Sequence, residues 1–365
     1  MSQQENTPHS KKAFIGAGLG HTAVVLESGE LMMWGLARQY QLGVDRLTEK
    51  ERRKGKTEAD LPPPEDRHSP EVVPALKAQG DKVTSIACGS SHTLTATSAG
   101  HVFSWGSGAF GKLGHDDDSD VRIPRLIEFK RKRISRVACG PEHSAVVSEA
   151  GEVLTWGAGS YGNLGHGDNT DQPKPKLVDS LVGKRCAPPV SQAAERVGVG
   201  RARVAGRRSP CVPITMLSHA VGGRCTSVAC GSKHTLALSN TGDVYAWGYG
   251  GGGRLGCGDN RGLFRPKLLE SMQGITCSLI AAGESHSLAL SGDRGQLYTW
   301  GLGDYGKLGH GDTTAQQLPR HLEFFRTMHL VWASGGAFHS AAVEEMGQVY
   351  TCATRCQISS PQQLN

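Results

Sequence analysis

Residues 137–168 read VACGPEHSAVVSEAGEVLTWGAGSYGNLGHGD and contain the unit that decides the fold. A short apolar run leads into Gly-x-x-His at His143. Trp156-Gly157 follows thirteen residues after the histidine, and Leu164-Gly165 follows eight residues after the tryptophan. The sequence contains six copies of this unit, with a period of about fifty residues. Such a period is typical of solenoids, propellers and other repeat arrays.

The marker residues recur at matching positions in the other copies. The histidines are His21, His92, His143, His234, His286 and His339. The tryptophans are Trp34, Trp105, Trp156, Trp247 and Trp300. Between them stands one turn glycine per copy: Gly29, Gly100, Gly151, Gly242, Gly295 and Gly347. In the sixth copy, residues 349–353 replace the Trp-Gly strand, and no Leu-Gly follows.

The segments between the markers predict short strands. In the third copy, residues 144–147 and 153–156 are small, β-branched or apolar, and these runs are too short for helices. Glycine between them allows the positive φ that a tight hairpin needs. The runs are apolar on both faces, as expected when each sheet is covered on both sides by neighbouring sheets. The chain is therefore predicted to be an all-β propeller with one blade per repeat.

At Gly-x-x-His, Trp-Gly and Leu-Gly-His-Gly-Asp the chain resembles the regulator of chromosome condensation repeat family, from about Ala13 to Cys352. The resemblance implies four-stranded blades and, in most members, a ring of seven blades. Only six copies of the repeat can be recognised in this sequence. The domain assignment is an N-terminal arm at 1–12 and a propeller at 13–365. The arm is a candidate for a missing strand of the last blade.

Two insertions interrupt the repeats, at about 48–68 and 183–224. The second holds eight Lys or Arg residues and one acid, a net of +7, whereas the whole chain carries +6. The basic character therefore belongs to this segment and not to the propeller. A basic segment without a strand or helix pattern can bind nucleic acid or acidic proteins. A solvated loop or a gene-model artefact such as a retained intron is the favoured interpretation.

The repeated histidines and tryptophans are assigned structural roles. Each histidine belongs to a different blade, so no three are expected to meet on one metal ion, and a hydrogen bond to backbone across strands explains them better. The tryptophans are expected to fill the space between blades. Four Gly-x-Gly-x-x-Gly matches follow the Trp strands without a helix, so they predict turns and not a cofactor site. No catalytic, cofactor or metal residue is assigned.

One basic run lies inside a legible repeat, at Lys130, Arg131, Lys132 and Arg133. It is a candidate nuclear localisation signal or phosphate contact. The alternative is a solvated outer strand or loop, which is favoured.

The function predicted is a non-catalytic scaffold for protein–protein interaction, acting as a monomer without cofactors. Nucleic acid is the less favoured partner. Ten cysteines without a Cys-x-x-Cys pair, and no signal peptide or membrane span, indicate an intracellular protein, cytoplasmic or nuclear.

Two alternatives follow from the resemblance. The first is guanine-nucleotide exchange on a Ran-like small GTPase. Members with that activity insert a wedge between the Trp-Gly strand and Leu-Gly of one blade, but here that spacing is eight residues in all five complete copies. The second is the substrate-recruiting module of a ubiquitin ligase assembly, with the catalytic activity in another chain.

Overall fold

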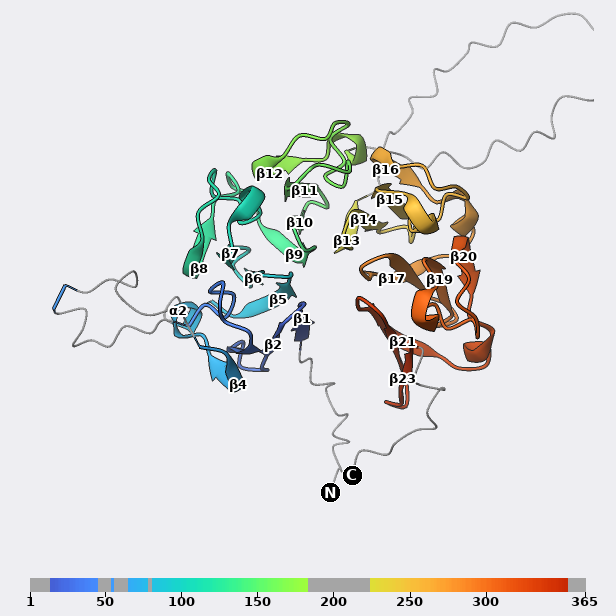
Figure 1. Ribbon diagram of the computed structural model, residues 1–365, viewed down its shortest axis with the longest axis horizontal. Coiled ribbons are helices and arrows are strands. Elements are labelled where there is room, and N and C mark those ends of the chain that lie inside the picture. Colours follow the sequence, from blue (N-terminus) through green and yellow to red (C-terminus); the bar gives the residue numbers. More distant parts are fainter. Residues whose placement is uncertain (1–13, 45–53, 56–64, 78–80, 183–223, 354–365) are drawn as a thin grey trace, which may run out of the picture.

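Six antiparallel sheets are arranged around a ring in the computed structural model, which describes residues 14–44, 54–55, 65–77, 81–182 and 224–353 (Figure 1). Five sheets have four strands and the sixth has three. The only α-helix in these ranges is α2 (Pro74–Lys77), so the all-β class and the propeller are confirmed.

The strands follow the chain within each blade. Blade 1 is β1 (Phe14–Ala17), β2 (His21–Val25), β3 (Leu31–Gly35) and β4 (Arg67–Val72). Blade 2 is β5 (Val83–Cys88), β6 (His92–Thr97), β7 (Val102–Gly106) and β8 (Val121–Ile127). Blade 3 is β9 (Ile134–Cys139), β10 (His143–Ser148), β11 (Val153–Gly157) and β12 (Gln172–Leu177).

The second half repeats this plan. Blade 4 is β13 (Cys225–Cys230), β14 (His234–Ser239), β15 (Val244–Gly248) and β16 (Leu263–Leu268). Blade 5 is β17 (Cys277–Ala282), β18 (His286–Ser291), β19 (Leu297–Gly301) and β20 (Gln316–His321), and blade 6 is β21 (Leu330–Gly335), β22 (Ser340–Glu344) and β23 (Val349–Cys352). Short 3₁₀ turns occur at η2 (Ala109–Gly111), η3 (Asp179–Leu181), η4 (Gly251–Gly253), η5 (Glu270–Met272), η6 (Asp304–Gly306) and η7 (Glu323–Phe325).

Each blade begins at the centre of the ring and ends at its rim (Figure 1). Tight hairpins join the second and third strands, and all six predicted turn glycines have positive φ, for example 81° at Gly151. A side chain there would be strained, which is why the repeat keeps glycine at this position.

The ring has six blades and not the seven that the family resemblance implied, because the chain carries six copies of the unit. Blades 1 and 6 lie on either side of an opening (Figure 1). Five blades have the expected four strands, and blade 6 shows three in the part of the chain that is described. The N-terminal arm, proposed to close this blade, lies outside the described residues.

The insertions are described only at their edges. Arg67 and His68 lie in β4, so the first insertion ends before them and not at residue 68 as the spacing suggested. The second insertion, apart from Arg224, lies outside the described residues.

One hydrogen-bonded link joins each blade to the next, and it is built from the predicted histidines. His143 Nε2 lies 3.0 Å from Thr235 Oγ1 of the next blade, and that hydroxyl donates to the Asn163 carbonyl at 2.8 Å. The same arrangement joins His21 to Thr93, His92 to Ser144, His234 to Ser287 and His286 to Ser340. The predicted acceptor was backbone, but the imidazole reaches a side-chain hydroxyl, which itself bonds the backbone.

The tryptophans converge on the same carbonyls. Trp247 Nε1 donates to the Asn163 carbonyl at 2.8 Å, so this oxygen accepts from two side chains of blade 4. Trp105 and Trp156 repeat the contact on Gln41 and Lys112. These three rings and Trp300 are fully buried between blades, at 0% exposure.

The two repeat residues that flank the opening differ from the others. Trp34 of blade 1 is only half-buried and His339 of blade 6 is exposed, because no described blade packs against blade 1 on that side or follows blade 6. Sequence position alone therefore does not bury a marker residue; the neighbouring blade does.

Removing a buried indole should destabilise the ring. Trp156→Ala or Trp247→Ala is expected to cost ~3–5 kcal/mol of unfolding free energy, as for other large core side chains. Trp34→Ala, at the opening, is the matched control and should cost clearly less. Denaturant unfolding measures all three. A Trp156→Ala or Trp247→Ala variant that unfolds like the parent but loses a partner would instead make the tryptophans binding residues.

The interblade histidines should make folding sensitive to acid. The Thr235 hydroxyl donates its only hydrogen to the Asn163 carbonyl, so His143 must donate to that hydroxyl through Nε2–H. The buried Nδ1 of His143 has no hydrogen-bond partner among the described residues. Burial lowers the pKa of His143 and of His21 to about 4 and that of His286 to about 3, from the ordinary 6.5. Burial also lowers the pKa values of His92 and His234.

Because the unfolded chain binds these protons more readily, stability should be complete above about pH 6.5 and fall between pH 6.5 and 4. Each histidine contributes a slope of ~1.4 kcal/mol per pH unit. His143→Gln removes one titrating group, so the slope of unfolding free energy against pH should drop by about one proton. His101→Gln, on the surface, is the control. A slope unchanged by His143→Gln would mean that His143 titrates alike in both states.

Candidate interaction surface

The ring has two faces with different loops. One carries the Gly-x-x-His loops together with the loops that follow the Trp strands, and we call it the His-loop face. The two loop types are joined by backbone hydrogen bonds, such as Ala158 N to Glu142 O at 2.9 Å and Tyr249 N to Lys233 O at 2.8 Å. The other, the hairpin face, carries the glycine hairpins and the connections between blades.

The Gly-x-Gly-x-x-Gly segments lie on the His-loop face as turns. Residues 106–111 run from the end of β7 into the three-residue turn η2, and no helix follows that presents its N-terminus to a phosphate. Among the described residues no cluster of His, Cys, Asp or Glu has the geometry to hold a metal ion. No helix in the described ranges is both long and apolar enough to cross a membrane.

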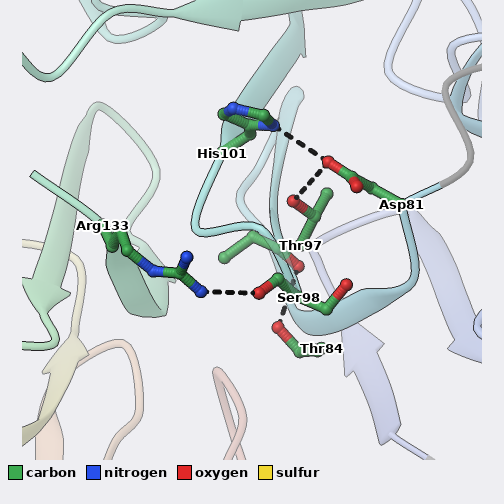
Figure 2. A network of polar contacts seen from close by, with 7 residues as sticks. Asp81, Thr84, Thr97, Ser98, His101 and Arg133 are labelled. Atoms are coloured by element: carbon green, nitrogen blue, oxygen red, sulfur yellow. Dashed lines mark hydrogen bonds and ion pairs between the residues drawn. The ribbon is translucent and has the colours of Figure 1, made fainter. Parts of the chain in front are cut away.

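The predicted basic run lies on the hairpin face, between blades 2 and 3. Lys132 Nζ donates to Glu152, and Arg133 pairs with Glu149 at 3.0 Å. Figure 2 shows Arg133 also reaching the Ser98 carbonyl, at 2.9 Å, beside the His101–Asp81 pair. Lys132 thus binds the hairpin of blade 3, and Arg133 joins the hairpins of blades 2 and 3.

The other two cations of the run are differently placed. Lys130 and Arg131 are exposed, with φ of 41° and 72°. They stand at the tip of the connection, which Lys132 N closes by donating to the Phe129 carbonyl at 2.9 Å. A phosphate or receptor contact by the run would therefore fall on Lys130 and Arg131, and it stays a prediction.

Aromatic rings are exposed on the His-loop face. Phe110, Tyr161, Tyr249, Tyr305 and Phe338 are each 39–57% exposed and come from blades 2 to 6. Tyr161 and Tyr249 meet edge-to-face with centroids 5.5 Å apart, and Tyr305 and Phe338 do so at 5.2 Å. Both pairs bridge adjacent blades, so the rings form paired patches and not scattered single residues.

Two of these rings stand on strained backbone. Phe110 has φ 62° and Tyr305 has φ 64°, in the left-handed region that bulky residues rarely adopt. Blade 4 places Gly252, with φ 74°, at the equivalent position. Glycine would serve the turn without strain, and Phe110 and Tyr305 remain 47% and 51% exposed, so burial offsets little of that strain. Strain kept at a surface position indicates a functional role.

Cations accompany the rings. Lys233 Nζ lies 4.3 Å from the Tyr161 ring centroid and 3.0 Å from its hydroxyl. Arg254 lies 4.9 Å from the Tyr249 centroid, and Lys307 Nζ donates to Ser285 Oγ at 2.8 Å. Burial lowers the pKa of both Arg254 and Lys307. The described residues include no carboxylate within 4.0 Å of these three cations.

The repeat pattern does not predict this surface. The tryptophans and most of the histidines of the repeat lie between blades, whereas the exposed rings lie in the glycine-rich loops that the sequence predicts to be turns. A signal was present: Phe110, Tyr161 and Tyr305 each stand five residues after the tryptophan of their blade. Turn geometry calls for glycine or a small polar residue there and not for an aromatic ring.

The chain matches a known repeat model over most of its length. The model, described as "Regulator of chromosome condensation (RCC1) repeat", matches residues 28–96, 99–147, 150–194, 241–290 and 294–343. A second model of the same repeat matches 83–112, 134–163, 225–254 and 277–307.

Curated proteins agree with these matches. The human E3 ubiquitin-protein ligase HERC2 is 38% identical over 284 residues, which are 77% of this chain but only 5% of HERC2. The Arabidopsis thaliana ultraviolet-B receptor UVR8 is 32% identical over 353 residues, 96% of this chain and 67% of that protein.

Solved structures support the fold alone. Human WBSCR16 matches with a TM-score of 0.67 at 20% identity, covering 97% of this chain and 75% of that one. Prp20p of Saccharomyces cerevisiae matches with a TM-score of 0.67 at 22% identity, covering 92% and 70%. The repeat models and UVR8 confirm the resemblance: the chain belongs to the family of regulator of chromosome condensation repeat proteins.

Proposed function

We propose that this propeller is a non-catalytic platform for protein–protein interaction and that its His-loop face is the binding surface. The observation that carries this proposal is the set of exposed rings on that face, two of them at left-handed φ. Aromatic side chains dominate the energetics of protein interfaces, and rigid scaffolds present them on loops. The loops here rest on blades that are joined by buried hydrogen bonds, so little ordering entropy opposes binding.

Exchange activity on a Ran-like GTPase remains the first alternative. The solved relative Prp20p was described together with its binding properties to Gsp1p and histones. In this chain the Trp-to-Leu loops are equally long in all five complete repeats, so none carries the wedge that the family's exchange factors insert. The scaffold is therefore favoured.

The likeness to HERC2 favours one setting for such a scaffold. A propeller of this kind would recruit substrates to a ubiquitin ligase whose catalytic part lies elsewhere, since this chain spans only 5% of that relative. The described cysteines are all free, which fits an intracellular compartment, cytoplasmic or nuclear.

The test is capture of partners from cell extract by the parent and by two variants. Tyr249→Ala combined with Tyr305→Ala should lose the bound proteins while keeping the parent's melting temperature, because both rings are exposed. Lys130→Ala combined with Arg131→Ala, on the hairpin face, is the control and should retain them.

Any GTPase recovered is then assayed for nucleotide release. Accelerated release by the parent chain would replace the scaffold with the exchange factor. Loss of partners only in the hairpin-face variant would place the binding surface on the other side of the ring.

A further inference from the structure

We propose that the His-loop face over blades 3 to 6 binds an acidic segment of a partner protein, in which carboxylates alternate with apolar side chains. The inference rests on the proposed function and adds the chemistry of the partner. The surface, here called the ring–cation strip, consists of Tyr161, Lys233, Tyr249, Arg254, Tyr305 and Lys307.

Among the described residues, no carboxylate pairs with a cation of the strip within 4.0 Å, although Glu284 lies near Arg254 and Lys307, and Asp304 lies near Lys307. The partners of its cations are neutral: the Tyr161 hydroxyl for Lys233, the Gly251 carbonyl for Arg254, and Ser285 Oγ for Lys307. Arg254 is 6% exposed and Lys307 3%, so water solvates them poorly. A buried charge is costly unless a hydrogen-bonded counter-ion contacts it, and a carboxylate that bonded these cations directly would lower that cost.

Three acids elsewhere on the same face form ion pairs with cations of the rim. Asp116 pairs with Lys174 at 2.6 Å, Asp117 with Arg125 at 3.9 Å, and Asp312 with Arg320 at 3.9 Å. These pairs join the loops to the outer strands β8, β12 and β20. These three rim cations are thus paired directly, whereas no cation of the strip has an ion pair of this kind in the described part of the chain.

The aromatic rings of the strip would contact the apolar side chains that lie between the carboxylates of the partner segment. Tyr161 and Tyr249 flank Lys233, whose Nζ lies 4.3 and 5.9 Å from their centroids. Between blades 5 and 6, Tyr305 packs on Phe338, and Lys307 follows Tyr305 in the same loop. Charged and apolar positions therefore alternate across neighbouring blades, and a bound segment must alternate in the same way.

A single-stranded nucleic acid also combines negative charge with flat apolar groups, and bases stack on such rings. However, exposed carboxylates share these loops: Glu142 and Glu284 in the His loops and Asp304 beside Tyr305. A polyphosphate backbone carries a charge at every residue and would meet these acids. A peptide can place its carboxylates only opposite the cations, so the observations favour a peptide.

The test is a selection of random twelve-residue peptides against the full chain, followed by anisotropy titration of the selected peptides with purified variants. Selected sequences should be enriched in Asp and Glu with interspersed apolar residues, and binding should weaken as salt is added. Lys233→Glu should weaken binding about tenfold or more, the effect of losing one charge-assisted hydrogen bond. Lys130→Glu makes the same charge change on the hairpin face and should leave binding within about twofold.

The outcomes separate this inference from the proposed function. Neutral or basic peptides that are lost on Tyr249→Ala would overturn the acidic partner and keep the binding face. Acidic peptides weakened equally by Lys233→Glu and Lys130→Glu would overturn the strip, because the attraction would be non-specific. Tighter binding of an oligo-dT strand than of any selected peptide would replace the peptide by nucleic acid. Peptides insensitive to both Tyr249→Ala and Lys233→Glu would overturn the inference and the proposed face together.

Discussion

A buried hydrogen-bonded link, centred on one backbone carbonyl, recurs at each interface from blade 1 to blade 6. At the interface between blades 3 and 4 this carbonyl belongs to Asn163, and it accepts hydrogen bonds from the Thr235 hydroxyl and the Trp247 indole. His143 in turn donates to the Thr235 hydroxyl. Three polar groups that would be costly to bury alone satisfy one another there. The histidine–hydroxyl–carbonyl arrangement recurs at all five interfaces from blade 1 to blade 6, and the indole hydrogen bond recurs at the first three of them.

The surface depends on that link. The accepting carbonyl sits just before Leu-Gly, at the end of the loop that carries the exposed ring, so the bond that joins two blades also fixes the loop above them. Tyr161 of blade 3 is held in this way against Lys233 of blade 4, and Tyr305 of blade 5 against Phe338 of blade 6. The rings are positioned before any partner arrives, which lowers the entropic cost of binding.

Much of the fold could be read from the sequence, because the repeat spacing reports the period of the blades and glycine marks each hairpin. Burial of the marker residues could not be read, since it depends on a neighbour: Trp34 matches Trp156 in sequence but faces the opening. The hydroxyl that receives each histidine lies 52 to 92 residues away along the chain, beyond any local pattern.

The candidate surface was missed for a related reason. Tyr161 and Tyr249 are 88 positions apart in sequence and meet only when blades 3 and 4 pack side by side. The basic run was visible because it is contiguous, yet two of its four cations turn out to bind hairpins. A contiguous run of basic residues therefore predicts the candidate interaction surface less well than single aromatic residues in loops do.

The link between blades is tested most directly by a double-mutant cycle on His143 and Thr235. Unfolding free energies of the parent, His143→Ala, Thr235→Val and the double variant give the coupling energy of the pair. If the imidazole donates to a hydroxyl that anchors the next blade, the coupling should be ~1 kcal/mol or more, as for contacting residues in one buried network. Additive effects, with coupling near zero, would contradict a structural role for the histidine link.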